Sequence, residues 1–226
     1  MKHGFFITGT DTEIGKTYFS VQLVKALRAH GRRVAVMKPV ASGARVIDGR
    51  LRNDDALALL AAAGSDQSYE TCNPFCYAPP IAPHVAAAQA GERIDTQRIV
   101  NQARALAAGA DFLVVEGVGG WRVPLDDNED VAALAARLQL PVILVVGLRL
   151  GCINHALLSA DAIRHDGVPF AGWVANRVDP AARNVREMIE TLRQRLAAPL
   201  LAELPHDGGE AELTNLVTRL DGDEES

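Results

Sequence analysis

The chain has 226 residues, 48% of them hydrophobic, which is enough for one large domain with a sizeable core. Its formal net charge is −5 and it has no basic block, so the sequence argues against a nucleic-acid partner. The odd count of three cysteines and a strand-like N-terminus without a charged leader indicate a reducing, cytoplasmic location, and the longest apolar run, 141–148, is too short to cross a bilayer.

Strand-like and helix-like segments alternate along almost the whole chain. Apolar strands joined by helices of this length predict an α/β fold, a mostly parallel sheet flanked by helices, in one domain over 1–226 with an acidic, disordered tail at 221–226. The segments 41–53 and 72–82 are rich in Gly, Pro and polar residues and are predicted to be long functional loops. Strands are predicted at 5–8, 33–37, 112–115, 142–146, 170–175 and 200–204, and helices at 16–30, 53–63, 83–90, 96–108, 130–138, 154–165 and 181–196.

The first predicted strand leads into a phosphate-binding loop, GTDTEIGKT at residues 9–17, which opens the first helix. Backbone N–H groups at a helix start bind phosphate oxygens, Lys16 can reach the outer phosphates and the Thr17 hydroxyl can ligate magnesium. Five residues separate the two glycines instead of the usual four, so Thr10 takes the first glycine's place. The alternative is an ordinary strand-to-helix turn, but the context of strand, loop and helix favours a P-loop NTPase fold that binds a nucleoside triphosphate.

Candidate metal ligands and a second cation follow later strands. Glu116 ends the apolar run 112–115, which places it at the C-terminal edge of the sheet, where open α/β folds bind ligands. Asp54 and Asp55 open a predicted helix, and spacing alone leaves metal binding and complementing the helix dipole equally plausible. Lys38 also ends a strand, where it either stabilises charge during phosphoryl transfer or is a solvated lysine.

The motifs in this order resemble the dethiobiotin synthetase family. The resemblance runs from about Phe6 to Pro205 and is specific in its combination, although the phosphate loop alone is shared with many nucleotide enzymes. It rests on GTDTEIGKT at 9–17, KPVASG at 38–43, NDDAL at 53–57, EGVGGW at 116–121, GCINHA at 151–156 and GWVAN at 172–176.

The resemblance implies an ATP-dependent ligase of biotin biosynthesis. In that family one amine of 7,8-diaminononanoate captures CO2 as a carbamate, and the carbamate attacks the γ-phosphate to give a carbamic–phosphoric anhydride. The second amine then closes the ureido ring, which releases dethiobiotin, ADP and phosphate. No protein nucleophile is needed, so the protein contributes positioning and electrostatic stabilisation.

The resemblance also implies site residues, position by position. Mg2+ would be held by Thr17, Asp55 and Glu116, and the catalytic groups would be Lys38, Lys16 and Thr12. Ser42 would hold the carbamate or the substrate amine. The implied ATP-binding set is Glu13, Ile14, Gly15, Lys16, Thr17, Tyr18, Asp55, Glu116, Gly117, Val118, Gly119, Asn176, Arg177, Pro205, His206, Asp207 and Glu212.

Two parts of the implied site lie far along the chain. Asn176 ends a strand, and its side-chain amide, both donor and acceptor, would read the adenine edge. Arg177 and residues 206–209 depart from the family pattern at the part of the site that would select the nucleotide base. Family members are homodimers, and the segment with Gly151, Cys152 and Asn154 would reach the partner's substrate carboxylate; the alternative is simple helix capping.

Two other functions share the predicted fold. A partitioning ATPase that switches dimers usually carries an extra lysine early in the phosphate loop, where this chain has Thr10 and Asp11. An amidoligase related to cobyrinate or CTP synthesis usually adds a glutamine-hydrolysing domain, for which this chain is too short.

Overall fold

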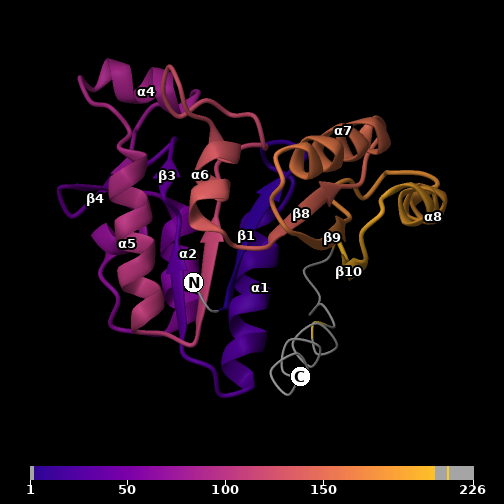
Figure 1. Ribbon diagram of the computed structural model, residues 1–226, viewed down its shortest axis with the longest axis horizontal. Coiled ribbons are helices and arrows are strands. Elements are labelled where there is room, and N and C mark those ends of the chain that lie inside the picture. The colour runs from indigo at the N-terminus through magenta and orange to yellow at the C-terminus, as the bar shows by residue number, and fades with distance from the viewer. Residues whose placement is uncertain (1–2, 207–212, 214–226) are drawn as a thin grey trace.

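Six strands form one sheet in the order β10-β9-β8-β1-β7-β2, and all neighbouring pairs are parallel (Figure 1). The computed structural model describes residues 3–206 and residue 213. The predicted α/β fold is confirmed. In chain order the elements are β1 (Gly4–Gly9), α1 (Lys16–Ala29), β2 (Val34–Met37), β3 (Val40–Ala41), β4 (Arg45–Ile47), β5 (Arg50–Arg52), α2 (Asp54–Ala63), α3 (Tyr69–Cys72), β6 (Phe75–Cys76), α4 (Pro83–Gln89), α5 (Thr96–Ala108), β7 (Phe112–Glu116), α6 (Val131–Leu138), β8 (Val142–Gly147), α7 (Cys152–His165), β9 (Phe170–Asn176), α8 (Val185–Arg195) and β10 (Leu200–Leu204).

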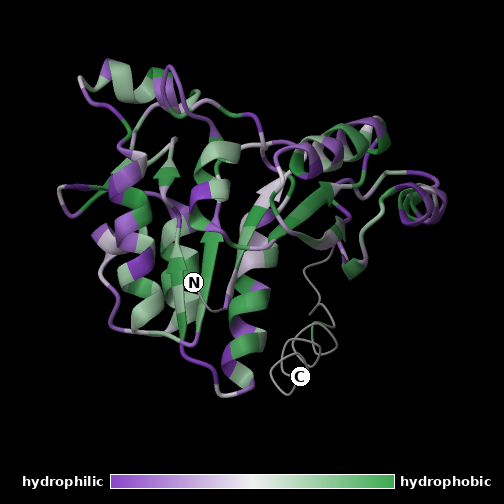
Figure 2. Ribbon diagram, in the orientation of Figure 1, coloured by the Kyte–Doolittle hydropathy of each residue, from purple (hydrophilic) through white to green (hydrophobic). Residues whose placement is uncertain are grey.

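Helices cover both faces of the sheet, which explains why β1, β7 and β8 are buried at every residue. Alternate residues turn to opposite faces, so Phe6 packs with α5, α6 and α7 while Ile7 packs with α1 and α2. Figure 2 shows the strands as mainly hydrophobic and the helices with mixed polar and apolar residues. None of the helices within residues 3–206 is long and apolar enough to cross a membrane.

The two predicted loops contain short regular elements. Within 41–53 the strands β4 and β5 form an antiparallel hairpin, whose turn residues Asp48 and Gly49 both have positive φ, at 49° and 74°. Residues 75–76 pair in parallel with 40–41 as β6 and β3. The helical turn α3 was not predicted either, because four residues are too few to show a helical period.

Helix α8 begins at Val185, four residues after its predicted start. The preceding segment is a turn, in which the Asp179 carboxylate accepts from Ala181 N at 2.8 Å. Asn184 then takes a left-handed conformation, with φ of 56°, and a regular helix cannot pass through it. The predicted strands and the other predicted helices are confirmed with ends that differ by no more than two residues.

Strand β2 lies at an edge of the sheet, and a side chain occupies that edge. Gln67 Nε2 donates to Val36 O at 2.6 Å, and Gln67 Oε1 accepts from Val36 N at 3.1 Å. The amide therefore makes the two hydrogen bonds that a neighbouring strand would make at Val36.

Candidate active site

The phosphate-binding loop leaves β1 and enters α1 at the C-terminal edge of the sheet. Gly15 precedes α1 with φ of 85°, a left-handed conformation that favours glycine, and α1 has no side-chain cap. The loop is anchored to β8 because Thr10 N donates to Val145 O at 3.0 Å. Lys16 Nζ donates to Asp11 O at 2.8 Å, so its ammonium lies under the loop. This is the geometry of a phosphate site.

Asn176, at the end of β9, holds the loop from the other side. Its Nδ2 donates to Ile14 O at 2.7 Å. A Cβ placed on Gly15 would lie 2.0 Å from the same nitrogen, so only glycine fits at this position. Asn176 thus fixes the entry to α1. Its proposed contact with adenine would have to use the remaining amide N–H and the carbonyl oxygen.

Lys38 and Glu116 form the centre of the site. Lys38 Nζ lies 2.6 Å from Glu116 Oε1 and 2.9 Å from Asp55 Oδ2, and it donates to Gly117 O at 3.3 Å. Thr17 Oγ1 donates to the same Glu116 oxygen at 2.8 Å. The fold therefore brings together side chains from α1, α2, β7 and the end of β2, which the sequence placed at the same edge.

The charges in this cluster shift one another's pKa values. Burial, and then the neighbouring Lys38, lower the pKa of Lys16 to about 8. Burial would also lower the pKa of Lys38, but Glu116 and Asp55 outweigh it and raise that pKa above its ordinary value. Burial would raise the pKa of Asp55, and the Lys38 ammonium outweighs it and holds that pKa below its usual range. Lys38 thus stays a cation at neutral pH, whereas Lys16 loses its proton as the pH rises through about 8.

A cavity of about 960 Å³ opens over this cluster. Ser42 lines it, and the Ser42 hydroxyl oxygen is buried without a hydrogen-bond partner among the described residues, which makes it a candidate ligand group. Of the predicted site residues, the cavity is lined by Thr12, Glu13, Gly15, Lys16, Thr17, Lys38, Ser42, Asp55, Glu116, Val118 and Gly119.

The oxygen donors at the cavity fit a divalent cation of the Mg2+ type. The Thr17 hydroxyl and the carboxylates of Asp55 and Glu116 are hard oxygen ligands. Glu116 has no exposed surface, and its Oε2 has no hydrogen-bond partner in the described part of the chain. A buried carboxylate oxygen without a partner is costly unless a cation or donor can reach it.

Other predicted site residues do not line this cavity. Ile14 is buried in the phosphate loop, Gly117 is buried directly after β7 with its carbonyl oxygen on Lys38, and Tyr18 is half-buried on α1. The predicted adenine residues gather beside Asn176, where Arg177 N donates to Leu204 O at 3.1 Å and the His206 ring contacts Arg177 O at 3.1 Å. Pro205 is exposed between them. The predicted Asp207 and Glu212, and the predicted tail 221–226, lie outside the described residues.

The predicted substrate segment begins α7 and is separate from the cavity of the same chain. Gly151 and Asn154 are exposed, and α7 has no side-chain cap. Cys152 is buried, with its thiol 3.8 Å from Met188 Sδ, so its side chain packs in the core. Any ligand contact by Cys152 would therefore use its backbone. Leu150, next to this segment, is 96% exposed.

Residues 80–83 and 122–124 also line the cavity. Residues 80–82 belong to the segment 72–82 that was predicted to be a functional loop, whereas sequence reasoning assigned no role to residues 122–124, whose only sequence signal is Pro124. Arg122 is fixed there, with nitrogens 2.8 Å from Asp166 and 3.3 Å from Asp130.

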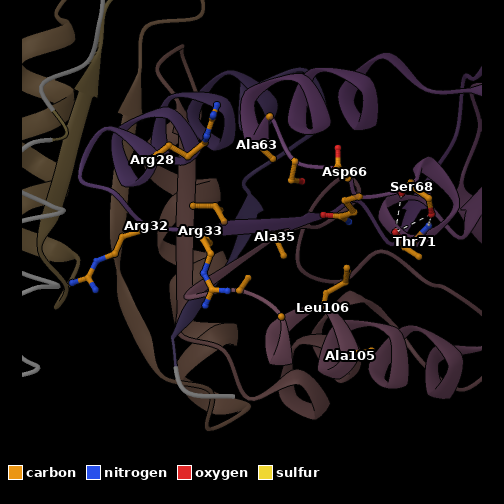
Figure 3. A pocket seen from close by; sticks show the side chains of 16 residues that line it. Arg28, Arg32, Arg33, Ala35, Ala63, Asp66, Ser68, Thr71, Ala105 and Leu106 are labelled. Atoms are coloured by element: carbon orange, nitrogen blue, oxygen red, sulfur yellow. Dashed lines mark hydrogen bonds between the residues drawn. The ribbon is translucent and has the colours of Figure 1, made fainter.

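A second cavity, of about 590 Å³, lies near the start of β2, at the opposite edge of the sheet. Figure 3 shows Arg28, Arg32 and Arg33 there, with side chains that point in different directions. Arg28 donates to Ala62 O at 2.8 Å and Arg33 pairs with Asp111 at 2.7 Å. Arg28 and Arg33 thus bind groups of the fold itself, and the three arginine side chains do not converge on a ligand site.

Comparisons with known proteins identify relatives over most of the chain. A family model described as an AAA domain matches residues 3–210. The chain is 52% identical over 205 residues to an ATP-dependent dethiobiotin synthetase, BioD, of Aromatoleum aromaticum, covering 91% of each chain. It is 48% identical over 222 residues to a protein of the same name from Marinobacter nauticus, covering 96% of this chain and 95% of that protein. Among solved structures, the septum site-determining protein MinD of Pyrococcus horikoshii, complexed with Mg-ADP, matches with a TM-score of 0.58 at 16% identity, over 92% of this chain and 82% of that one.

Proposed function

The chain belongs to the ATP-dependent dethiobiotin synthetase family, and we propose that the cavity over Lys38 and Glu116 is where it carries out that reaction. Members of this family are ligases that form carbon–nitrogen bonds at the expense of ATP. The observation that carries the proposal is that two lysines, two carboxylates and Ser42, whose buried hydroxyl has no partner among the described residues, line one cavity at the phosphate loop.

The phosphates of ATP bind the loop before α1. The backbone N–H groups at the start of α1 and the Lys16 ammonium contact phosphate oxygens, and Thr12 and Glu13 line the approach. Asn176, Arg177, Pro205 and His206 form the adenine end. The Thr17 hydroxyl and the carboxylates of Asp55 and Glu116 would hold Mg2+, which when bound neutralises negative charge on the transferring phosphate.

The substrate diamine lies between Ser42 and Lys38. One amine adds to CO2 and loses a proton, which gives a carbamate held by the Ser42 hydroxyl. A carbamate oxygen attacks the γ-phosphorus, and the bond to ADP breaks. The second amine then attacks the carbamate carbon, closes the ring and expels phosphate. Lys38 and Lys16 stabilise the negative charge on carbamate and phosphoryl oxygens, which is the main contribution that a protein can make to this chemistry.

The decisive experiment is a product assay with 13C-bicarbonate, ATP, Mg2+ and 7,8-diaminononanoate. Mass spectrometry is expected to find dethiobiotin with one 13C atom in its ureido carbonyl, and one ADP for each product. Omitting the diamine or the bicarbonate is expected to abolish ADP formation. Rapid ATP hydrolysis without the diamine, and no dethiobiotin with it, would reject the proposal and favour a switching ATPase.

We also propose that the active protein is a cytoplasmic homodimer whose substrate site is completed by Gly151 and Asn154 of the partner. The exposed start of α7 beside the exposed Leu150 supports this, because an uncapped helix start can bind the substrate carboxylate. Lys38→Ala and Asn154→Asp would each inactivate a homodimer through different halves of the site. Mixing the two with subunit exchange is expected to restore about a quarter of wild-type activity, since half of the dimers carry one intact site. No restoration by the mixture would reject the shared site.

A further inference from the structure

Helix α3 lies behind the active site, and two of its hydrogen-bonding side chains join the backbone segments that carry Lys38 and Asp55. We propose that Tyr69, which begins α3, and Asn73, which directly follows it, are positioning residues that fix the placement of Lys38 relative to Asp55. Neither side chain lines the cavity. The proposal rests on the roles given above to Lys38 and Asp55.

The end of α3 holds both main-chain groups of Lys38. Lys38 N donates to Cys72 O at 2.8 Å, and Asn73 Nδ2 donates to Lys38 O at 2.7 Å. Strand β2 ends at Met37, so these two bonds take over where sheet pairing stops. The backbone from which the Lys38 side chain extends is therefore set by α3.

The start of α3 holds the residue that caps α2. Tyr69 Oη accepts from Asn53 N at 2.7 Å and donates to Asn73 Oδ1 at 2.8 Å. The Asn53 side chain in turn accepts from Asp55 N at 3.1 Å and from Ala56 N at 3.3 Å. An unbroken series of hydrogen bonds thus runs from Lys38 O through Asn73, Tyr69 and Asn53 to Asp55 N.

The two amides of this series are buried, and Tyr69 between them is half-buried. Asn53 and Asn73 are only 8% and 3% exposed, so water does not compete for their hydrogen bonds. The Tyr69 ring is held beneath the Arg52 guanidinium, 4.0 Å from its centroid, and Arg52 pairs with Glu70 at 3.1 Å. The link does not depend on the Lys38–Asp55 ion pair. It therefore keeps the two backbones in place when phosphates and a metal compete for their side chains.

Tyr69→Phe tests this role, because it removes the hydroxyl and keeps the ring beneath Arg52. We expect kcat to fall by about 10- to 100-fold, the usual effect of losing a group that orients metal ligands. The Kd for ATP in the absence of Mg2+ is expected to stay within about twofold, and the Mg2+ concentration for half-maximal activity to rise, because Asp55 is displaced. Tyr77→Phe is the matched control, since Tyr77 is buried and its hydroxyl contacts Glu92 at 3.4 Å, outside this series.

Asn73→Asp tests the end of the hydrogen-bond series that contacts Lys38. It keeps the acceptor for Tyr69 and loses the donor to Lys38 O. If the residues act as one unit, the Tyr69→Phe/Asn73→Asp double variant is expected to lose no more turnover than the worse single variant. Multiplicative losses would mean that the two act separately and would overturn the proposed unit.

Thermal unfolding is measured for each variant, and turnover is compared well below the lowest melting temperature. A Tyr69→Phe enzyme with kcat within about twofold of Tyr77→Phe would overturn the proposal. So would an activity loss that only follows the unfolded fraction, or an equal loss of ATP affinity. These outcomes leave the overall function untouched, because that function is judged by whether the wild type forms 13C-labelled dethiobiotin.

Discussion

The Lys38 ammonium lies 2.6 Å from Oε1 of Glu116, a carboxylate with no exposed surface. Asp55 contacts the same ammonium at 2.9 Å from the cavity side. The proposed metal ligands and the proposed catalytic cation therefore touch one another, and a change in one alters the others.

Lys38→Ala is expected to reduce turnover far more than ATP affinity. Lys38 acts on charge that develops during phosphoryl transfer, and losing one such donor typically costs about 100- to 1,000-fold in kcat. Steady-state kinetics and equilibrium ATP binding are compared with Lys25→Ala, which removes an exposed lysine from α1. An equal loss of ATP binding would mean that Lys38 serves nucleotide binding instead.

Asp55→Asn and Asp54→Asn are a matched pair of adjacent substitutions. Asp55 pairs with the buried Lys38, whereas Asp54 pairs at 2.8 Å with Arg45 on the surface. We expect Asp55→Asn to lower kcat by more than about tenfold and to raise the Mg2+ concentration needed for half-maximal activity, because a carboxylate ligand is lost. Asp54→Asn is expected to change activity little, since exposed ion pairs contribute little. Similar losses in both variants would remove Asp55 from the metal site.

ATP binding is expected to take up protons near pH 8. The pKa of Lys16 is about 8 in the free protein, and phosphate charges raise it, so about half a proton is taken up at pH 8 and little at pH 6.5. It follows that ATP affinity falls as pH rises above this pKa. Calorimetry in buffers of different ionisation enthalpy measures the uptake. Lys16→Arg, which stays charged, is expected to abolish it, and a buffer-independent heat for the wild type would contradict the prediction.

Gly15→Ala is expected to abolish ATP binding, because the new Cβ would lie 2.0 Å from Asn176 Nδ2 and would displace the loop. Gly31→Ala is the control that isolates the cost of backbone strain from that of a steric clash. Gly31 also has a positive φ, 76°, but nothing lies within 4 Å of its Cβ position. We expect Gly31→Ala to cost about 1–2 kcal/mol of unfolding free energy with normal kinetics. Normal ATP binding in Gly15→Ala would show that the loop adapts.

Much of the fold followed from the sequence because buried parallel strands and amphipathic helices have strong patterns. Glu116 and Lys38 were placed at the sheet edge because each directly follows an apolar strand. Spacing could not choose between Asp54 and Asp55 as a metal ligand. The resemblance selects Asp55, and the ion pair of Asp55 with Lys38 supports that choice. The contacts of Tyr69 and Asn73 were beyond sequence reasoning, because they join residues up to 35 positions apart through a helix of four residues.

The Gln67 side chain on β2 has a consequence beyond the active site. An edge strand with unpaired backbone N–H and C=O groups can pair with an extended segment of another chain, and such pairing is a common route to aggregation. By satisfying both groups of Val36, Gln67 blocks such recruitment at the middle of a four-residue strand. One amide therefore helps to keep copies of this protein from adding to one another through their sheets.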